Sequence, residues 1–398
     1  MNGSYQRLTP DAVSALGGFA EGLGALRREI HRRPETAFTE VETSARVAAQ
    51  LRALGLEVHT GLATTGVVAS LQGRRGLGRR IGLRADMDAL FIDEANGFEH
   101  RSQVAGKMHA CGHDGHTAML IGAAAWLRER ADFAGTVHFI FQPAEESEGG
   151  ARVMIEQGLF ERFPCDAVYG LHNDPGLEAG RFKIRSGSMM AAGDTWEVRF
   201  EGTGGHGAMP HKATDPTMAL ATFLTGLPTI VGRNVPATEA AVISIGHIAA
   251  GAHASPNIIP ASVLVRGTAR SYTAAVRDVL ENRLRQLCEA AALGHGLQAH
   301  FKYIRRYPSL VNWPEPTRLA VQAAQAVAGA EHVNAECELV GGSEDFAFML
   351  QKVPGAYIML GNGIGPNLHT PRYEFNDAII PAGVAYWVNL VAAELGAA

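Results

Sequence analysis

The feature that most limits the fold is the order in which helical and strand patterns follow one another along the 398 residues. Up to residue 186, helical patterns alternate with short apolar runs, and the alternation returns after residue 307. This order predicts an α/β domain of three layers, αβα, in which helices cover both faces of a mainly parallel sheet. The predicted strands are 67–71, 80–84, 136–141 and 167–171, and the predicted helices are 15–33, 41–54 and 115–130.

Between residues 187 and 307 the order changes to β-α-β-β-α-β. It predicts an inserted α+β module of ferredoxin-like type. We therefore expect a discontinuous domain made of 1–186 and 308–398, and a second domain made of 187–307. A chain of this length also exceeds the usual size of one hydrophobic core. The predicted elements of the module are 195–200, 216–231, 240–248, 262–271, 274–293 and 298–303.

Charge and composition exclude several classes of protein. The net charge is −5 and no run of Lys or Arg occurs, which argues against a nucleic-acid partner. No apolar run approaches the roughly 20 residues that cross a bilayer, and the N-terminus does not resemble a signal peptide. The four cysteines are far apart and do not form a small-domain disulfide pattern. We expect a cytoplasmic protein without a membrane partner.

The densest chemical motif is the segment 109–116, His-Ala-Cys-Gly-His-Asp-Gly-His, with five potential metal ligands in eight positions. Thiolate and imidazole suit zinc and its first-row neighbours. Gly112 and Gly115 are expected to let the backbone turn, so that Cys111 and His113 converge on one point. A His-rich surface loop is the weaker interpretation, because such density rarely serves packing.

A second motif, 142–146, follows the predicted strand 136–141 and contains Glu145 and Glu146. Active sites of α/β sheets lie beyond the carboxyl ends of the strands. Of two adjacent carboxylates, one can bind metal while the other accepts a proton from water. A solvated acidic loop would be favoured if the pair stood alone.

Three further histidines stand at positions where a side chain can reach a site. His172 follows the predicted strand 167–171, and His369 lies in a loop rich in Gly, Pro and Asn. Together with the two motifs they supply enough ligands for two metal ions. His206 lies in a Gly-rich turn of the inserted module, and an exposed hairpin histidine is an equally good interpretation there.

Several stretches, in the same order along the chain, resemble the M20 metallopeptidase family. The resemblance is closest to the branch of hippurate hydrolases, bacterial N-acyl-amino-acid amidohydrolases and plant auxin-conjugate hydrolases. The stretches are 26–35 (LRREIHRRPE), 84–90 (RADMDAL), 109–116, 142–146 followed by 149–151, 206–211 and 341–346.

The resemblance implies a di-metal catalytic domain and a smaller lid domain through which the subunits dimerise, or form a higher homo-oligomer. It implies hydrolysis of the amide of an N-acyl (acetyl, benzoyl or aryl-acetyl) amino acid to a carboxylic acid and a free amino acid. Two divalent ions per subunit, Zn, Mn, Co or Ni, are the implied cofactors. The implied metal ligands are Cys111, His113, Glu146, His172 and His369.

The resemblance also assigns roles to other residues. Glu145 corresponds to the general base. His206 corresponds to a lid histidine that reaches the active site of the partner subunit and polarises the substrate carbonyl. Asp88 matches an acidic position that steers a metal-bound group, and Asn257 a lid residue that contacts substrate. Phe91 stands where this branch usually has proline, so we expect it to change the shape of the substrate pocket.

Other functions stay open at this point. Cys111 could be the nucleophile of a thiol hydrolase with His113 or His172 as base, although the glutamates would then lack a role. A metal-storage or sensor protein and, within the same family, a dipeptidase are further alternatives. The di-metal interpretation requires that His369 lie beside the Cys111 loop.

Overall fold

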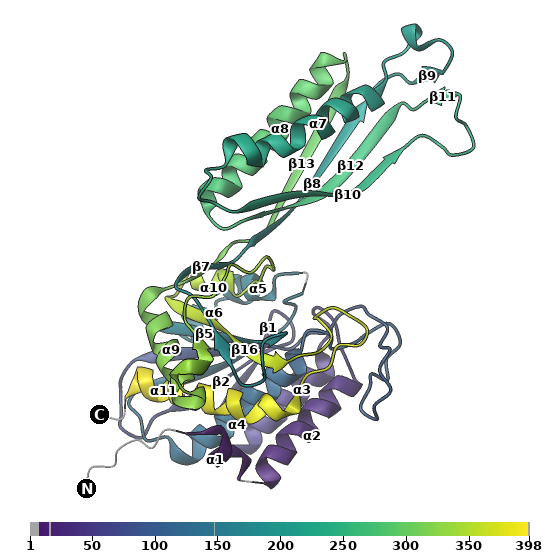
Figure 1. Cartoon of the computed structure of the whole chain (residues 1–398). Helices are drawn as coiled ribbons and strands as arrows, with labels where there is room; N and C mark the ends of the chain where they lie inside the picture. Colours follow the sequence, from purple (N-terminus) through teal and green to yellow (C-terminus); the bar gives the residue numbers. More distant parts are fainter. Residues whose placement is uncertain (1–7, 16, 147, 397–398) are drawn as a thin grey trace. The chain divides into compact units, whose positions relative to one another are not determined.

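The computed structural model describes residues 8–15, 17–146 and 148–396 (Figure 1). They form two compact units. The first takes in the described residues of Met1–Gly187, Val311–Glu338 and Phe348–Ala398, and the second those of Ser188–Leu310 and Leu339–Ala347. Residues 339–347, expected in the larger domain, belong to the smaller unit, where the Ala191 amide donates to the carbonyls of Val340 and Gly342 at 3.1 and 3.0 Å.

The first unit is built on an eight-stranded mixed sheet with a parallel centre. Its four central strands are mutually parallel, whereas β2 runs antiparallel to β4 and β6 antiparallel to β16. The predicted α/β class with a mainly parallel sheet is thus confirmed. In spatial order the strands are β1 (Glu57–Leu62), β2 (Gly66–Gln72), β4 (Thr136–Gln142), β3 (Arg80–Asp86), β5 (Ala167–Pro175), β16 (Gly355–Gly363), β6 (Phe182–Lys183) and β15 (Val333–Asn334).

Helices cover the sheet, as the burial of its central strands shows. Successive strand residues point to opposite faces, so the continuous burial of β3 from Ile81 to Asp86 means that both faces are covered. The predicted helix 15–33 begins only at Gly18, after α1. The helices of this unit are α1 (Pro10–Ser14), α2 (Gly18–Arg32), α3 (Val41–Ala53), α4 (His113–Arg130), α5 (Gly150–Glu156), α6 (Leu159–Arg162), α9 (Pro314–Ala328) and α11 (Ile380–Leu395), together with α10 (Ala347–Leu350) from its second residue on.

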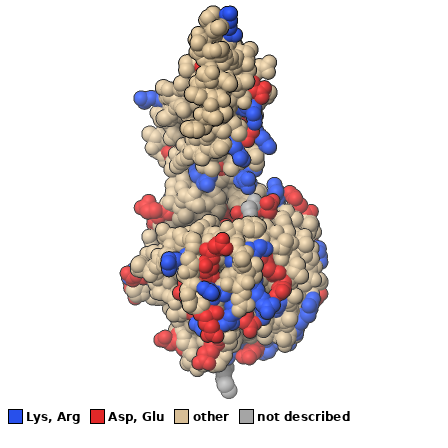
Figure 2. All heavy atoms as spheres, turned by 90° about the vertical axis from the view of Figure 1, so that its right-hand side faces the viewer, with Lys and Arg blue, Asp and Glu red and all other residues tan. Residues whose placement is uncertain are grey.

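The sequence-based expectation that no apolar run approaches a membrane-crossing length is wrong for one described segment, Asp377–Leu395, which is long and apolar enough by length and composition. This segment contains α11, and 83% of its apolar window is buried inside the structure. Burial of this extent is typical of the core helix of a globular unit. Figure 2 shows acidic and basic side chains intermingled on the visible face of the larger unit.

The second unit contains a four-stranded antiparallel sheet in the order β10-β12-β8-β13. Helices α7 and α8 pack against it around a core that includes Trp196, Phe223 and Leu284. The β-α-β-β-α-β chain order and this strand order make the unit ferredoxin-like, as predicted. Its main elements are β8 (Ala192–Glu201), α7 (Pro216–Asn234), β10 (Ala241–Ala250), β12 (Ser262–Ser271), α8 (Ala274–Gly294) and β13 (Gln298–Tyr307).

Short elements complete the chain. In the second unit β9 (Gly205–His206) pairs with β11 (Ile258–Ile259), and a 3₁₀ turn, η1 (Pro210–Lys212), follows. Strands β7 (Gly187–Met190) and β14 (Leu310–Asn312) lie where the chain passes between the units. The remaining 3₁₀ turns are η2 (Ala330–His332) and η3 (Asp377–Ile379).

Candidate metal centre

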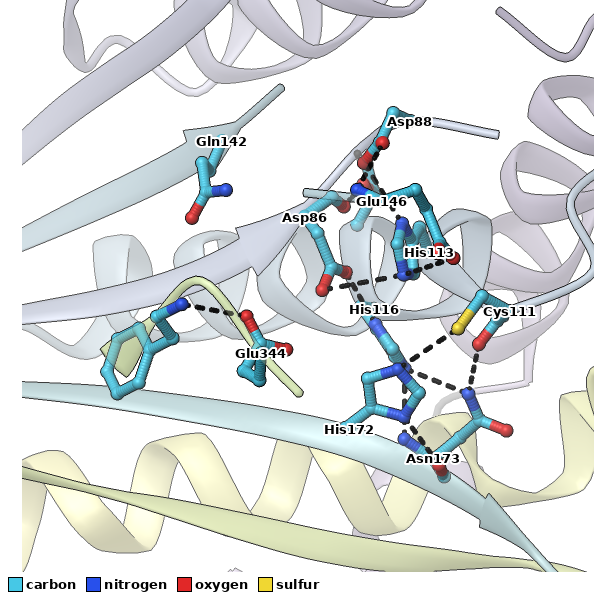
Figure 3. A network of polar contacts seen from close by, with 12 residues as sticks. Asp86, Asp88, Cys111, His113, His116, Gln142, Glu146, His172, Asn173 and Glu344 are labelled. Atoms are coloured by element: carbon cyan, nitrogen blue, oxygen red, sulfur yellow. Dashed lines mark hydrogen bonds and ion pairs between the residues drawn. The ribbon is translucent and has the colours of Figure 1, made fainter. Parts of the chain in front are cut away.

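The chemical motifs meet at the carboxyl ends of the central strands. β3 ends at Asp86, β4 ends three residues before Glu145, and β5 carries His172 (Figure 3). Cys111 lies in the loop before α4, and His113 is the first residue of that helix. Because parallel strands end at the same edge of a sheet, side chains that are far apart in the sequence are brought together here.

The structure brings together the five side chains predicted as metal ligands. Cys111 Sγ lies 3.3 Å from His172 Nε2. Glu146 Oε1 lies 3.2 Å from His369 Nε2 and 3.8 Å from His113 Nε2. Ligand atoms of Cys111, Glu146 and His369 lie within 4.8 Å of one another. The imidazole of His369 is therefore beside the Cys111 loop, where the di-metal interpretation requires it.

The backbone at His369 supports this placement. Its φ is +60°, a left-handed conformation that is uncommon for residues other than glycine. Its amide donates to the carbonyl oxygen of Ala110 at 2.8 Å, next to Cys111. Such strained backbone clusters at functional sites, where the surrounding structure holds it in place.

The hydrogen bonds of two histidines leave one nitrogen of each ring available to a metal. His113 Nδ1 lies 3.2 Å from Asp88 Oδ1, and His172 Nδ1 lies 2.6 Å from the Asn173 carbonyl oxygen. Since a carboxylate and a carbonyl only accept, the proton of each neutral ring is on Nδ1. The Nε2 lone pairs then face Glu146 and Cys111. Metal-binding histidines in proteins are held in this way.

His113 Nε2 is buried and makes no hydrogen bond within the part of the chain that the structure describes. A buried polar atom without a partner is costly, and a cation would satisfy it. A thiolate, a carboxylate and three imidazoles are donors that suit zinc, manganese, cobalt or nickel. The side chains present therefore fit a pair of divalent ions.

Electrostatics also favour cations at this place. Burial and the carboxylates of Glu146 and Glu145 raise the pKa of the Cys111 thiol well above its ordinary value. Burial alone would lower the pKa of His113, but the carboxylates of Asp86, Asp88 and Glu146 raise it to about 10. Without a metal, Cys111 and His113 thus keep their protons because the pocket has an excess of negative charge. Divalent ions would replace those protons, because ligands must be deprotonated to bind.

Asp88, predicted as a catalytic residue that steers a metal-bound group, lies behind the ligands. Its Oδ1 contacts His113 Nδ1, and its Oδ2 accepts a hydrogen bond from the Glu146 amide at 3.0 Å. It is 1% exposed. Asp88 therefore orients two predicted ligands through their nitrogen atoms.

Glu145, the predicted general base, is 6% exposed. Ligand atoms of Glu145, Glu146 and His113 lie within 4.8 Å of one another. The second carboxylate of the acidic pair is therefore next to the predicted ligands.

Two residues that sequence reasoning did not select, Asp86 and His116, form a further group with His113 and His172. His116 Nδ1 lies 2.6 Å from Asp86 Oδ1, and His116 Nε2 accepts from the Asn173 amide at 2.9 Å. Asp86 is also paired with Arg84 at 2.7 Å. Both ring nitrogens of His116 make hydrogen bonds, so neither has a lone pair available for a metal ion. His116 therefore contacts the centre through hydrogen bonds only. The only sign of it in the sequence was its place in the His-rich motif.

The two other potential ligands of the His-rich motif serve differently. Asp114 Oδ2 lies 2.8 Å from His31 Nδ1, and both side chains are buried. His109 is buried, and neither of its ring nitrogens has a hydrogen bond among the described residues. Burial lowers the pKa of His109 to about 3, so its ring is neutral.

The two glycines of the motif differ in their roles. Gly112 has a φ of +91° and precedes α4, which fits the predicted turn. The prediction for Gly115 is wrong, because this residue lies in the first turn of α4 and does not bend the chain. A Cβ there would lie 2.2 Å from the ring of Phe375, so Gly115 is needed for close packing.

His206 and Asn257 are neighbours at one end of the second unit. His206 pairs with Ile258, and the Gly207 amide donates to the Asn257 carbonyl at 2.7 Å. His206 Nδ1 accepts from the Ala208 amide at 3.0 Å. The proton of the neutral ring is therefore on Nε2, and the exposed side chain presents an N–H donor.

Phe91 lies in the long loop after β3 and is 76% exposed. Lys107 Nζ lies 5.7 Å from the centroid of its ring. The bridge between Leu90 and Met108 places this part of the loop beside the segment that leads to Cys111. Its contact with substrate stays a prediction.

Comparison with known proteins agrees with the resemblance. Residues 82–393 match the family described as Peptidase family M20/M25/M40. The chain is 36% identical over 367 residues to the N-acetylcysteine deacetylase of Bacillus subtilis strain 168, covering 92% of this chain and 94% of that protein. It is 36% identical over 383 residues to the hippurate hydrolase of Campylobacter jejuni, covering 96% of this chain and 98% of that protein.

Among solved structures, that of the YXEP protein of Bacillus subtilis, described as a dinuclear metal binding peptidase from the M20 family, matches with a TM-score of 0.83. The sequence identity is 33%, over 95% of this chain and 99% of that one. The fold is thus that of a dinuclear metal-binding peptidase, and it carries a candidate binuclear site. The family match over residues 82–393 and these relatives establish that the chain belongs to peptidase family M20/M25/M40.

Proposed function

We propose that this protein is a metal-dependent amidohydrolase that splits an N-acyl amino acid into a carboxylic acid and a free amino acid. The observation that carries the proposal is the convergence of Cys111, His113, Glu146, His172 and His369, with a further carboxylate, Glu145, beside them. The two relatives are named for N-acetylcysteine and hippurate, which are both N-acylated amino acids.

A pair of divalent ions held by these five side chains would supply an activated water and polarise the amide carbonyl. Side chains of the protein carry out the proton transfers and orient the ligands. Glu145 accepts the proton of the attacking water and returns it to the nitrogen of the leaving amino acid. Asp88 keeps His113 in the tautomer whose Nε2 lone pair faces the centre.

In line with the resemblance, we assign the stabilisation of the developing oxyanion to His206 of the partner subunit. Its neutral ring carries the proton on Nε2, which is the form needed to donate to a negatively charged oxygen. Preorganised donors of this kind contribute about 3–4 kcal/mol to transition-state stabilisation. Asn257, its neighbour, is assigned a contact with the substrate, in line with the resemblance.

A cysteine nucleophile is not supported. A reactive thiolate needs a lowered pKa, whereas burial and the carboxylates of Glu146 and Glu145 raise the pKa of Cys111. A storage or sensor protein would have no use for Glu145, a second carboxylate placed beside the predicted ligands. A dipeptidase of the same family is the remaining alternative. The rates at which the enzyme hydrolyses N-acyl amino acids and dipeptides distinguish the two functions.

The substitution Glu145→Gln tests the assignment of the base. We expect kcat to fall by about 10²–10⁴-fold, because a general base contributes that much. Metal content, measured by elemental analysis, should stay as in the wild type. Glu148→Gln is the matched control, since Glu148 is exposed three residues further on. Loss of metal in Glu145→Gln would mean that the roles of Glu145 and Glu146 are exchanged.

A substrate panel tests the reaction. Acetyl-, benzoyl- and indole-acetyl-amino acids and glycyl dipeptides are compared on enzyme reconstituted with Zn, Mn, Co or Ni. Hydrolysis of the acylated amino acids with little cleavage of the dipeptides is the expected result, and the reverse preference would contradict the proposal. Phe91→Pro in the same panel should change the preferred acyl group, since Phe91 is predicted to shape the pocket.

We also propose that the protein works in the cytoplasm as a homodimer or a higher homo-oligomer. The four cysteines are all free, as expected in a reducing compartment. Strand β10 is an edge of the four-stranded sheet and exposes Val242 and Ile248, a surface that favours pairing with another chain. Sedimentation analysis tests the assembly, and a monomer at micromolar concentration would contradict it.

A further inference from the structure

Three segments that carry predicted metal ligands converge on the side chain of Asn173. This residue follows His172 on β5. Its Nδ2 donates to the carbonyl oxygen of Cys111 at 2.6 Å (Figure 3). Its Oδ1 accepts from the hydroxyl of Tyr373 at 2.8 Å. Tyr373 lies four residues after His369, in the same loop. One amide group thus contacts the Cys111 loop, strand β5 and the C-terminal loop.

The orientation of this amide is fixed by the chemistry of its neighbours. The Cys111 carbonyl only accepts, so nitrogen must face it, and oxygen then faces Tyr373, whose hydroxyl must donate. The backbone amide of Asn173 donates to His116 Nε2 at 2.9 Å, and His116 in turn donates to Asp86. Asn173 Nδ2 also lies 3.1 Å from His116 Nε2, which accepts here, so this contact too requires that the nitrogen of the amide faces the Cys111 side.

The space around the amide is filled. Asn173 is 1% exposed and Tyr373 is fully buried. A Cβ on Gly112 would lie 2.3 Å from Asn173 Nδ2 and 2.5 Å from the Tyr373 hydroxyl oxygen. The backbone beside Cys111 therefore rests directly on these two polar groups. Moving either group would move the thiol.

We propose that Asn173, held by Tyr373, is a positioning residue of the metal centre, whose amide fixes where Cys111 lies relative to His172 and His369. The inference rests on the proposed function, because it takes Cys111 to be a metal ligand. Partners that orient metal ligands typically change metal affinity by 10–100-fold when they are removed. Tyr373 and Asn173 themselves have no contact with the metal in this scheme.

Cobalt-substituted protein tests the inference without a measurement of activity. A thiolate bound to Co²⁺ gives a near-ultraviolet charge-transfer absorption, and the visible bands report the geometry of the ligands. Tyr373→Phe removes only the hydroxyl that holds the amide. We expect Co²⁺ affinity, measured by competition with a chelator, to fall by about tenfold or more, with a weakened or shifted charge-transfer band.

Tyr386→Phe is the matched control. Tyr386 is also fully buried in the first unit, but its hydroxyl has no hydrogen-bond partner within the described ranges. Tyr386→Phe should leave the Co²⁺ affinity and the absorption spectrum unchanged. Asn173→Ala, compared with Asn389→Ala at another buried site, should have a larger effect than Tyr373→Phe. If Asn173→Ala fails to fold, Tyr373→Phe still decides.

The inference is overturned if Tyr373→Phe matches Tyr386→Phe in both cobalt affinity and charge-transfer band. It is also overturned if the wild-type protein shows no thiolate band, because Cys111 would then not be a ligand. A wild-type protein that shows the band but hydrolyses no N-acyl amino acid would refute the proposed function alone. The variants' spectra would still decide on Asn173.

Discussion

A buried charge network behind the metal centre gives a sharp test of the electrostatics. His31, on α2, lies with Nδ1 2.8 Å from Asp114 Oδ2 and Nε2 3.2 Å from Glu94 Oε1. Arg27 Nη1 is 3.6 Å from the same Asp114 oxygen. Asp114 directly follows His113, so the network holds the start of α4 in place. Burial would lower the pKa of His31, but its hydrogen bonds to Asp114 and Glu94 raise it to about 9.

The size of the effect follows from linkage. A rise of the pKa from 6.5 in the unfolded chain to about 9 in the folded protein corresponds to roughly 3 kcal/mol of stability, at about 1.4 kcal/mol for each tenfold change in proton affinity. Because the folded pKa is the higher one, this stability is fully present below pH 6.5. It is lost as the pH rises through about 9.

The variant His31→Gln removes the charge and leaves two buried carboxylates with less compensation. At about pH 6 we expect it to be roughly 3–5 kcal/mol less stable than the wild type, as for other broken buried pairs. At about pH 10 the wild-type ring is neutral too, so the difference should shrink by roughly 3 kcal/mol.

Thermal unfolding of metal-loaded protein, followed by calorimetry at both pH values, measures this difference. The gap in Tm between wild type and variant should narrow by about 6 °C, since 1 kcal/mol shifts Tm by about 2 °C for a unit of this size. His59→Gln, at a half-buried histidine beside the exposed Glu57, is the control and should show no such change. A gap that is equal at both pH values would refute the reasoning.

Two further substitutions probe the centre itself. Cys111→Ala should lower the metal content, and a variant with full metal and activity would contradict the ligand assignment. Peroxide should inactivate the wild-type enzyme more slowly when metal is bound, because coordination shields the thiolate. Gly112→Ala should destabilise the protein by at least about 1–3 kcal/mol in denaturant titrations, since φ is +91° and the Cβ would meet Asn173 at 2.3 Å. Gly97→Ala, where a Cβ meets no atom within 4 Å, is its control, and equal effects of the two would contradict the packing argument.

Much of the architecture could be predicted because it follows from local patterns. Buried central strands read as short apolar runs, and the change of element order near residue 187 indicated an inserted ferredoxin-like unit. The predicted ligands converge because the carboxyl-terminal parts of neighbouring strands, such as that of β5 with His172, share one edge of the sheet. A motif that combines thiol and imidazoles in eight positions also has few other uses.

Other features depend on contacts between distant segments and left little trace in the sequence. Asn173 and Tyr373 are 200 positions apart, and nothing in either neighbourhood indicates their hydrogen bond. The role of Gly115 is set by Phe375, which no local rule could reveal. His116 was one of the five potential ligands of the His-rich motif, and only its two hydrogen bonds show that both of its ring nitrogens are engaged. Residues of the same chemical type, such as the histidines of the motif, thus have different roles that only the packing of distant segments determines.

The place of β16 in the larger sheet has a consequence for synthesis on the ribosome. This strand pairs with β5 along its whole length, yet it is made about 180 residues later. At 5–20 residues per second, the outer edge of β5 lacks its neighbour for roughly 10–40 s. An open strand edge is a template for aggregation. We therefore expect the inserted unit, whose own sheet is complete by Tyr307, to fold first, while the nascent larger unit depends on chaperones until Gly363 has emerged.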